Sequence, residues 1–420
     1  MTGPLWGTLP DRWLAGQVKN AATVTLGKML QSRDSGSDAR SPYMRAANVQ
    51  PDGVLALDDV NEMWFSDAER EQLSIRVGDV VVVEGGQGGF GRAAYIGEDL
   101  PGWGFQNSIS RLRPFGGFDG RFIAFYLIAL RAGGFIRAYS NVVSMPHLTA
   151  EKLARIPMPL PPLEEQHAIA DYLDRETARI ATLIEEQQRL VEILRERRDS
   201  AWGACVETAR RLGRPVAVRR VIESIVDGPF GSSLTSAHYS DEGVRVIRLG
   251  NIGVNEFKVG DAAFIPLDYA EELEAHAVEQ GDVVVAGLGD DKMPLGRAAV
   301  VPALGPAIVK ADCYRLRPNE QVSPAYLAWV MSAPQTRSQI MLLARGSTRA
   351  RLNTTVVQQV EIPVPERHTQ DALVAKSDAE TAKIDTLIAE TERFIELARE
   401  RRSALITAAV TGQIDVREMA

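Results

Sequence analysis

Two arginine-containing stretches of this sequence combine several hydrogen-bonding side chains within a few residues. Residues 344–355 read ARGSTRARLNTT, and residues 131–148 read RAGGFIRAYSNVVSMPHL. Guanidinium groups bind guanine and phosphate, and carboxamides bind adenine, so these residue types suit contact with a nucleic acid. The alternative is a pair of surface loops whose arginines form ion pairs with local carboxylates.

A glycine-rich loop at residues 86–91, GQGGFG, matches the G-x-G-x-x-G pattern of dinucleotide-binding folds. In those folds the third glycine opens a helix, but here the strand-like RAAYI follows. The corresponding loop at residues 287–296, GLGDDKMPLG, lacks the pattern. We therefore expect a tight loop between two strands.

Motifs of catalysis are missing from the sequence. It contains no Walker A, HExxH or GxSxG motif, and no Asn/Asp-Pro-Pro-aromatic motif of an amino-methyltransferase. Two cysteines and five scattered histidines predict neither a disulfide framework nor a metal site. The sequence is therefore typical of a binding protein.

The 420 residues predict two or three domains, and the net charge is −8. Such acidity argues against nucleic-acid binding. However, the net charge is 0 for residues 1–155, −3 for 156–213, −2 for 214–361 and −3 for 362–420. A local basic face can therefore exist in the nearly neutral regions. The first residues do not resemble a signal peptide, and the longest apolar run has nine residues, too few to span a bilayer, which favours the cytoplasm.

The whole chain is an internal duplication with an offset of about 204 residues. ETARIATLIEE at 176–186 and ETAKIDTLIAE at 380–390 share eight of eleven residues. Upstream, VGDVVVV, GRAA and RLRP of the first half recur in order as QGDVVVA, GRAA and RLRP. Each half therefore consists of a diverged region followed by a better-matched helical segment.

The helical segment of the first half runs from Glu164 through Glu196 without a proline. Its apolar residues follow the 3-and-4 spacing of a coiled coil, and the second copy keeps that spacing. About 40 residues would give a helix of roughly 60 Å. The two copies are expected to pack against each other in antiparallel orientation; the alternatives are two core helices or a homodimeric coiled coil.

The diverged regions are expected to be mixed α/β structures. Residues 80–83 and 283–286 predict buried strands, RAAYI and RAAVV predict return strands, and FIAFYLIAL and AYLAWVM predict amphipathic helices. We therefore expect an α+β fold with two α/β domains, residues 1–155 and 214–361, and two helical spacers, residues 156–213 and 362–420.

Several segments resemble the specificity subunits of type I restriction-modification systems. IPMPLPPLEEQHAIADYLD at 156–174 is similar to the central segment of that family, and DGPFGSSL at 227–234 to the opening of a target-recognition domain. LPDRW at 9–13 and TAAVTGQIDV at 407–416 are similar to its two ends. The first half lacks a clear DGPFGS, and IPVPERHTQ has lost the Pro-Pro of the first lead-in.

This resemblance implies a DNA-reading scaffold without catalysis. Each target-recognition domain would read one half of a bipartite, asymmetric site, and the antiparallel helix pair would set the gap. Two methyltransferase subunits would dock on the helices, bring S-adenosylmethionine and methylate adenines, and restriction subunits would add ATP- and Mg-dependent cleavage. The chain itself would bind no cofactor. Other possibilities are a coiled-coil adaptor, a subunit of a methylation-only complex, or a dinucleotide-dependent enzyme.

Within this family, DNA contacts are expected from the two arginine-containing stretches and the glycine loops. The candidates are Gln87, Arg92, Arg131, Arg137, Asn141, Lys292, Arg297, Arg345, Ser347, Thr348, Arg349 and Arg351. A residue that reads bases should differ between two domains that read different sequences. Arg92 and Arg297, and the recurring pairs Arg45/Asn48 and Arg248/Asn251, are therefore at least as well explained by a structural role.

Overall fold

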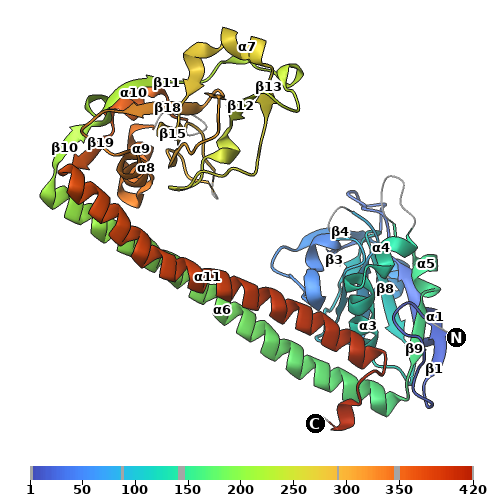
Figure 1. Cartoon of the computed structure of the whole chain (residues 1–420). Helices are drawn as coiled ribbons and strands as arrows, with labels where there is room; N and C mark the ends of the chain where they lie inside the picture. The colour runs from blue at the N-terminus through green and yellow to red at the C-terminus, as the bar shows by residue number, and fades with distance from the viewer. Residues whose placement is uncertain (1–2, 87–88, 141–146, 291–292, 345–350, 419–420) are drawn as a thin grey trace. The chain divides into compact units, whose positions relative to one another are not determined.

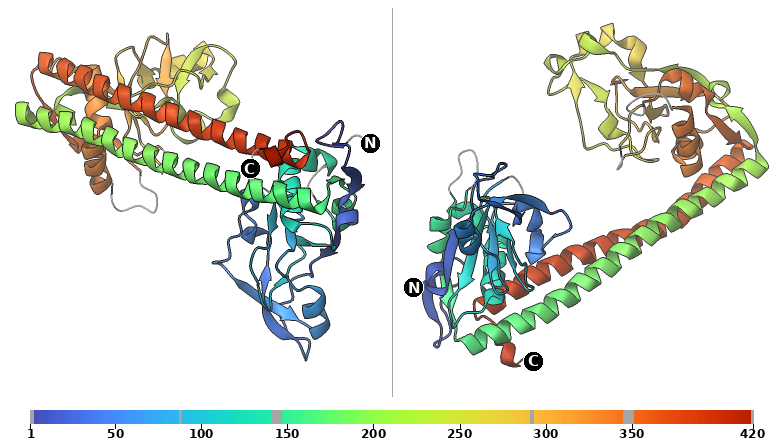
Figure 2. Two further views of the ribbon diagram at one scale, coloured as in Figure 1. Left: turned by 90° about the horizontal axis from the view of Figure 1, so that it is seen from below. Right: turned by 180° about the vertical axis from the view of Figure 1, so that it is seen from behind.

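The computed structural model describes residues 3–86, 89–140, 147–290, 293–344 and 351–418 (Figures 1 and 2). The chain forms two compact units. The first consists of residues 1–187 and 393–420, and the second of residues 188–392. Each unit contains one sheet-rich region together with a part of each of two long helices.

The first unit contains the following strands and helices. They are β1 Leu14–Gln17, α1 Val18–Ala21, β2 Ala22–Leu26, β3 Ala39–Met44, η1 Ala46–Asn48, η2 Pro51–Gly53, β4 Asn61–Phe65, α2 Asp67–Gln72, β5 Val80–Val83, β6 Ala93–Tyr95, β7 Gly104–Phe105, β8 Ile109–Pro114, α3 Gly120–Ala132, α4 Phe135–Tyr139, α5 Ala150–Ala154, β9 Pro157–Leu160 and η8 Val416–Glu418.

The second unit repeats much of this order. Its elements are β10 Arg214–Ala217, η3 Val218–Arg220, β11 Ile222–Val226, η4 Gly231–Ser233, η5 Ser236–His238, β12 Val244–Ile247, η6 Leu249–Asn251, β13 Phe264–Ile265, α7 Leu267–Glu272, η7 Glu274–His276, β14 Ala277–Val278, β15 Val283–Ala286, β16 Ala298–Val300, β17 Ala307–Val309, β18 Cys313–Pro318, α8 Pro324–Ser332, α9 Pro334–Leu343, α10 Thr354–Gln359 and β19 Glu361–Val364.

Each unit is built around an antiparallel four-stranded sheet, in the order β2-β8-β5-β6 in the first and β11-β18-β15-β16 in the second. A second sheet, β4-β3-β7 or β13-β12-β17-β14, lies beside it in the same unit. A two-stranded ladder, β1-β9 or β10-β19, precedes each long helix. The expected return strands are confirmed, because β6 and β16 pair antiparallel with β5 and β15.

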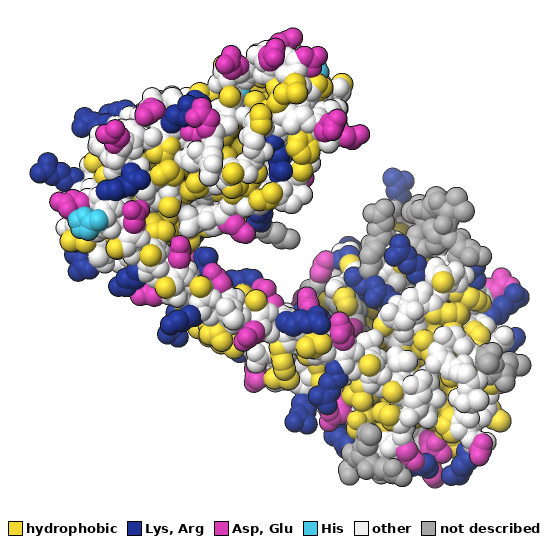
Figure 3. Space-filling model, viewed as in Figure 1, with side chains coloured by type: hydrophobic (Ala, Val, Ile, Leu, Met, Phe, Trp, Pro, Cys, Tyr) yellow, Lys and Arg dark blue, Asp and Glu magenta, His cyan; other side chains and the backbone are white. Residues whose placement is uncertain are grey.

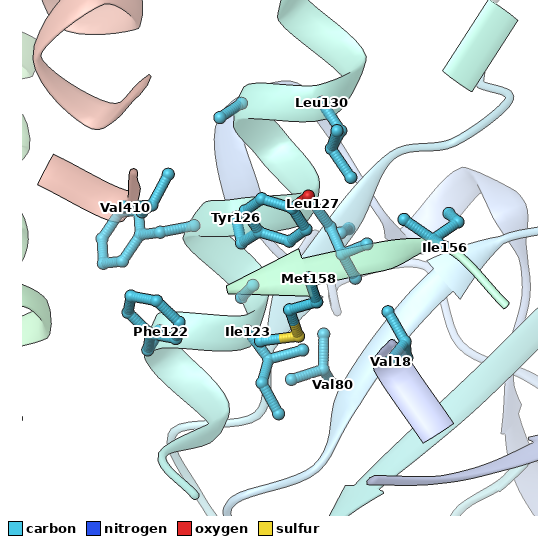
Figure 4. Close-up of a cluster of buried hydrophobic side chains, with 14 of the residues drawn as sticks. Val18, Val80, Phe122, Ile123, Tyr126, Leu127, Leu130, Ile156, Met158 and Val410 are labelled. Carbon is cyan, nitrogen blue, oxygen red and sulfur yellow. The ribbon is translucent and has the colours of Figure 1, made fainter. Parts of the chain in front are cut away.

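The continuous valine run of β5 is explained by burial on both faces of its sheet. Val80 and Val82 pack in the cluster that contains α3, whereas Val81 and Val83 pack against the second sheet. Figure 4 shows part of the first cluster, with Val80 close to Ile123 and Met158. Because successive strand residues face opposite sides, a strand covered on both faces has no polar alternation.

The two helices expected to be amphipathic are buried on nearly all sides. In α3, most residues from Phe122 to Leu130 are buried, and in α8 all residues from Tyr326 to Ser332 are buried. The polar face is missing because each helix packs between its sheet and residues of the long helices, as Phe122 does with Leu173 and Val410. The expectation of an amphipathic helix is therefore wrong at both places.

The two long helices are α6 Leu163–Leu212 and α11 Arg367–Val410, and they are longer than the sequence predicted. In the first unit, Ile169 of α6 shares a core with Ile406 of α11. In the second unit, Arg198 donates to Asp385 at 2.5 Å and Arg195 to Glu392 at 2.8 Å. Early α6 thus meets late α11, and late α6 meets earlier α11, which confirms the antiparallel pairing (Figure 2).

In each unit, one buried glutamine holds the first turn of a long helix against the core helix of that unit. The carboxamide of Gln166 accepts from the Asp119 N–H at 2.9 Å and donates to the Pro161 carbonyl at 2.8 Å. Gln370 accepts from the Ser323 N–H at 2.9 Å and donates to two carbonyls. The recurrence of this glutamine in the sequence is therefore explained by a structural role.

Replacing Gln370 with alanine is expected to lower the free energy of unfolding by about 3 kcal/mol, because one buried N–H and two carbonyls lose their partner. Chemical denaturation of the purified chain measures this change. Gln188→Ala removes an exposed glutamine and should alter stability by less than about 0.5 kcal/mol. Equal effects of the two substitutions would contradict the assigned role.

The segments that carried the resemblance at the two chain ends meet the central segment within the first unit. The indole N–H of Trp13 donates to Glu165 at 2.7 Å. Gly412 has φ 71° and lies so close to Pro10 that an added Cβ would approach its ring to 2.5 Å. LPDRW, the central segment and TAAVTGQIDV thus form one packed cluster. This explains why segments so far apart in the sequence carry the resemblance together.

Candidate nucleic-acid interface

In each unit, three loop segments are joined by the same pair of backbone hydrogen bonds. In the first unit, the Glu84 N–H donates to the Ser108 carbonyl at 2.9 Å, and the Leu148 N–H donates to the Glu84 carbonyl at 2.8 Å. In the second unit, Gly287 N–H to Asp312 O and Leu352 N–H to Gly287 O measure 2.8 and 2.9 Å. The glycine loop and the arginine-containing stretch are therefore neighbours.

A tightly packed glycine brings a further loop to the same place. A Cβ on Gly27 would lie 2.3 Å from the Gln106 carbonyl oxygen, and a Cβ on Gly228 would lie 2.1 Å from the Lys310 carbonyl carbon. Only glycine allows this approach. We call the resulting loop clusters the first edge (residues 27–30, 84–86, 106–108 and 147–148) and the second edge (residues 227–231, 287–290, 310–312 and 351–352).

The side chains of the second edge hold an arginine over an exposed aromatic ring. The Arg351 Nε donates to Asp312 at 2.8 Å, and its guanidinium carbon lies 5.8 Å from the centre of the Phe230 ring. This hydrogen bond raises the pKa of Arg351. Asp312 has φ 65°, and its N–H donates to the Asp227 carboxylate at 2.9 Å. Asp312 and Asp227 therefore hold the Arg351 side chain in a fixed position.

The first edge carries different side chains on the same backbone. His147, the counterpart of Arg351, is exposed. It forms an isolated antiparallel β-bridge with Gly85, as Arg351 does with Leu288. Burial raises the pKa of Glu84, while the nearby His147 acts in the opposite direction. Met29 is exposed beside Lys28, whose ammonium group donates to Glu69 at 2.6 Å. The two edges thus share a scaffold and differ in the groups that they offer a ligand.

The structure describes five of the twelve predicted contact residues: Arg92, Arg131, Arg137, Arg297 and Arg351. Of these five, Arg351 lies on one of the two edges. The predictions that fall outside the described residues are Gln87, Asn141, Lys292, Arg345, Ser347, Thr348 and Arg349.

Arg297 is a structural residue, which argues against its prediction as a DNA contact. Its side chain is buried and donates to the carbonyls of Ile252 at 2.6 Å, Leu288 at 2.8 Å and Leu249 at 3.0 Å. Burial lowers its pKa. A guanidinium whose donors are used inside the protein has none left for a base. Its role is to tie the glycine loop to η6.

Arg92, the counterpart of Arg297, is half-buried and donates to the Val49 carbonyl at 3.3 Å. Arg131 donates to the Phe90 carbonyl at 3.1 Å, and burial together with the charge of Arg92 lowers its pKa. Arg137 is exposed in the last turn of α4. Arg131 and Arg137 keep their assignment as predicted contacts, and Arg92 follows the structural pattern of Arg297.

The recurring arginine and asparagine pairs also shape the backbone. Asn48 and Asn251 are buried, and each accepts from the N–H of the arginine three residues earlier, at 3.0 and 2.8 Å. Arg45 and Arg248 form ion pairs with Asp59 and Asp261. Their recurrence in both halves therefore reflects a shared turn.

Replacing Arg297 with alanine is expected to lower the free energy of unfolding by at least about 3 kcal/mol, because several buried carbonyls lose their donor. Arg92→Ala, which removes one long hydrogen bond at the equivalent position, should cost about 1 kcal/mol. Denaturant titration of both variants tests the difference, and an Arg297 variant as stable as the natural protein would contradict the structural role.

A second candidate surface lies on the long helices, where large apolar side chains are exposed between charged ones (Figure 3). In the first unit they include Leu183, Phe394 and Leu397, here called the first apolar set. In the second unit they include Leu387, Leu190 and Ile193, called the second apolar set. Each residue is 36–60% exposed, and each member of one set corresponds to a member of the other at an offset of 204.

The predicted contacts omitted two features of the site. Phe230 and Met29 were missed because the candidates were chosen among hydrogen-bonding residues, although Phe230 stands inside the quoted DGPFGS segment. The apolar sets were missed because a heptad stripe does not show which of its residues face the partner helix.

Comparisons with known proteins agree with this architecture. Residues 58–195 match the family model described as the type I restriction modification DNA specificity domain. The type I restriction enzyme StySPI specificity subunit of Salmonella potsdam is 26% identical over 177 residues, which are 42% of this chain and 38% of that protein. The MjaVIII specificity subunit of Methanocaldococcus jannaschii is 21% identical over 310 residues, 70% of each chain.

Two solved structures share the fold. One, from work on complex assembly and conformational transition of the type I R-M system, has a TM-score of 0.70 at 16% identity and covers 97% of this chain and all of its own. The HsdS subunit of Thermoanaerobacter tengcongensis has a TM-score of 0.51 at 18% identity, with 98% of this chain and all of that chain covered.

The fold is therefore that of a specificity subunit, with two sheet-rich domains and two long helices. The family model over residues 58–195 and the named relatives support the same class, the specificity subunits of type I restriction-modification systems. The chain spans 38% of the length of its Salmonella relative. Among the described residues, no helix is both long and apolar enough to cross a membrane.

Proposed function

We propose that this chain is the DNA-reading subunit of a type I restriction-modification complex and performs no catalysis itself. Each sheet-rich domain reads one half of a bipartite, asymmetric duplex site. The helix pair sets the unread gap between the two halves. The relatives are named as specificity subunits, which supports this assignment.

The observation that carries the proposal is the contrast between the two edges. Their backbone hydrogen bonds match within 0.1 Å, yet His147 stands in the first edge where Arg351 stands in the second. Arginine binds guanine or phosphate, whereas a histidine offers a different set of donors and acceptors. Residues that only maintain the fold, such as Asn48 and Asn251, are the same in both. A shared scaffold with different edge groups is what two different half-sites require.

The partners in this proposal are double-stranded DNA, two copies of a methyltransferase subunit, and restriction subunits. The two apolar sets support paired docking, because the same three positions are exposed in both copies of the duplication. A side chain of this size contributes about 1.5 kcal/mol or more when it is removed from water. Two equivalent sets therefore suit two copies of one partner.

The cofactors belong to the partners in this proposal. S-adenosylmethionine binds the methyltransferase subunits, and ATP and Mg are used by the restriction subunits. The described residues contain no group of three or more His, Cys, Asp or Glu that could hold a metal ion. The complex works in the cytoplasm, where the chromosome is accessible.

Mapping of methylated adenines in the host genome, with and without the gene, tests the proposal. We expect one bipartite motif to be methylated in the natural strain and unmodified in the deletion strain. The purified complex should retard a duplex with that motif and not a scrambled duplex. Unchanged methylation in the deletion strain, together with equal binding of both duplexes, would exclude the proposed function.

Transformation with unmethylated DNA that carries the motif separates two forms of this function. Restriction of that DNA indicates a complex with restriction subunits. Efficient transformation with intact methylation indicates a methylation-only complex, and the DNA-reading role of the chain is the same in both.

A further inference from the structure

Both edges expose a large apolar side chain at the same position of the duplicated scaffold, and the first edge also exposes Leu30. Met29 follows the packed Gly27 by two residues, and Phe230 follows the packed Gly228 by two residues. Met29 is 76% exposed and Phe230 is 52% exposed. Single exposed apolar residues are common on protein surfaces. Two at equivalent places, each fixed by a glycine that has no room for a Cβ, indicate a function of these positions.

The surroundings of Phe230 define what such a residue can do. One side of its ring is covered by the guanidinium of Arg351, which Asp312 holds in place. The carboxylate of Asp227 accepts from the Gly228 N–H at 2.7 Å and from the Asp312 N–H at 2.9 Å, so the loop and the arginine share one support. Burial raises the pKa of Asp227. The ring is thus presented to solvent in a fixed orientation beside a cation.

Resting on the proposed function, we propose that Met29 and Phe230 are base-contacting residues, each pressing its apolar side chain against the base pairs of one half-site. Apolar side chains contact thymine methyl groups in the major groove, and Phe or Met also wedges between base-pair steps. Because His147 stands in the first edge where Arg351 stands in the second, the feature common to both edges is the apolar group. Arg351 adds a charge-dependent contact in the second edge alone.

Titration of the complex, purified with its own partner subunits, tests this inference. The DNAs are a duplex that carries the methylation motif and a scrambled duplex, each at several salt concentrations. Phe230→Ala and Met29→Ala are each expected to weaken specific binding about tenfold or more, with scrambled-duplex binding unchanged. Because no phosphate contact is lost, the slope of log affinity against log salt should also stay unchanged. Controls are Val259→Ala in the second unit and Val54→Ala in the first, which remove similarly exposed apolar groups.

Randomised half-sites give a second readout. Phe230→Ala should relax base preference in one half-site and Met29→Ala in the other. Variants that bind the specific duplex like the natural complex would overturn the inference. A salt slope that falls in Phe230→Ala as it does in Arg351→Ala would also overturn it, since Phe230 would then act only by positioning the arginine. A natural complex that binds both duplexes equally would overturn the proposed function, and the inference with it.

Discussion

In the proposed complex with two methyltransferase subunits, substitution of Leu190, Ile193 and Leu387 by serine is expected to remove one of these subunits. These residues form the second apolar set, and each contributes about 1.5 kcal/mol or more when buried. The combined loss weakens the association on the order of a thousandfold, which leaves one partner copy per chain at micromolar concentration. Native mass spectrometry of the purified complex measures the number of copies directly.

The first apolar set provides the matched comparison. Serine at Leu183, Phe394 and Leu397 should also leave one copy, and serine at all six positions should leave none. Leu14→Ser, which changes a 70% exposed leucine in β1, should keep both copies. Retention of two copies by the six-fold variant would show that the partner docks elsewhere.

Replacement of Arg351 by alanine is expected to lower affinity for the specific duplex by about 10- to 100-fold and to relax specificity in one half-site only. The Nε of Arg351 is bound to Asp312, and its terminal amino groups make no hydrogen bond to any described residue. Loss of one cationic contact should reduce the salt slope by about one. Fluorescence anisotropy with both duplexes at several salt concentrations measures these changes.

Two comparisons make the Arg351 result specific. Arg219→Ala removes an exposed arginine at the start of the same domain and should leave affinity and salt slope within twofold of the natural complex. His147→Ala should affect the other half-site. If the Arg351 variant lost affinity equally for both half-sites, or for the scrambled duplex as well, its contact would be general and not specific.

Much of the fold follows from the sequence because the duplication allows each element to be recognised twice. The strands at residues 80–83 and 283–286, their return strands and the two long helices are confirmed. The domain boundaries stay a prediction. The error at α3 and α8 has a physical cause: a helix covered by a sheet on one side and by long helices on the other has no polar face to reveal its environment.

The candidate site was less predictable, because side-chain roles depend on contacts between distant segments. Arg297 and Arg351 look alike in sequence, but the first is buried among carbonyls and the second is exposed on Phe230. The argument that a base-reading residue should differ between the domains separates the two, because Arg297 recurs as Arg92 whereas Arg351 is replaced by His147. No local pattern marks the support that Asp227 and Asp312 give to Arg351, since they lie 85 residues apart.

The two apolar sets also bear on how the protein is made in the cell. A chain released from the ribosome before its partner is available carries the six apolar side chains of these sets in contact with water. Such surfaces promote self-association. Synthesis in step with the partner would protect the chain, and unassembled copies would be lost to aggregation or proteolysis. The docking helices would then also act as a quality-control device that keeps DNA-reading subunits from accumulating without the subunits that act on DNA.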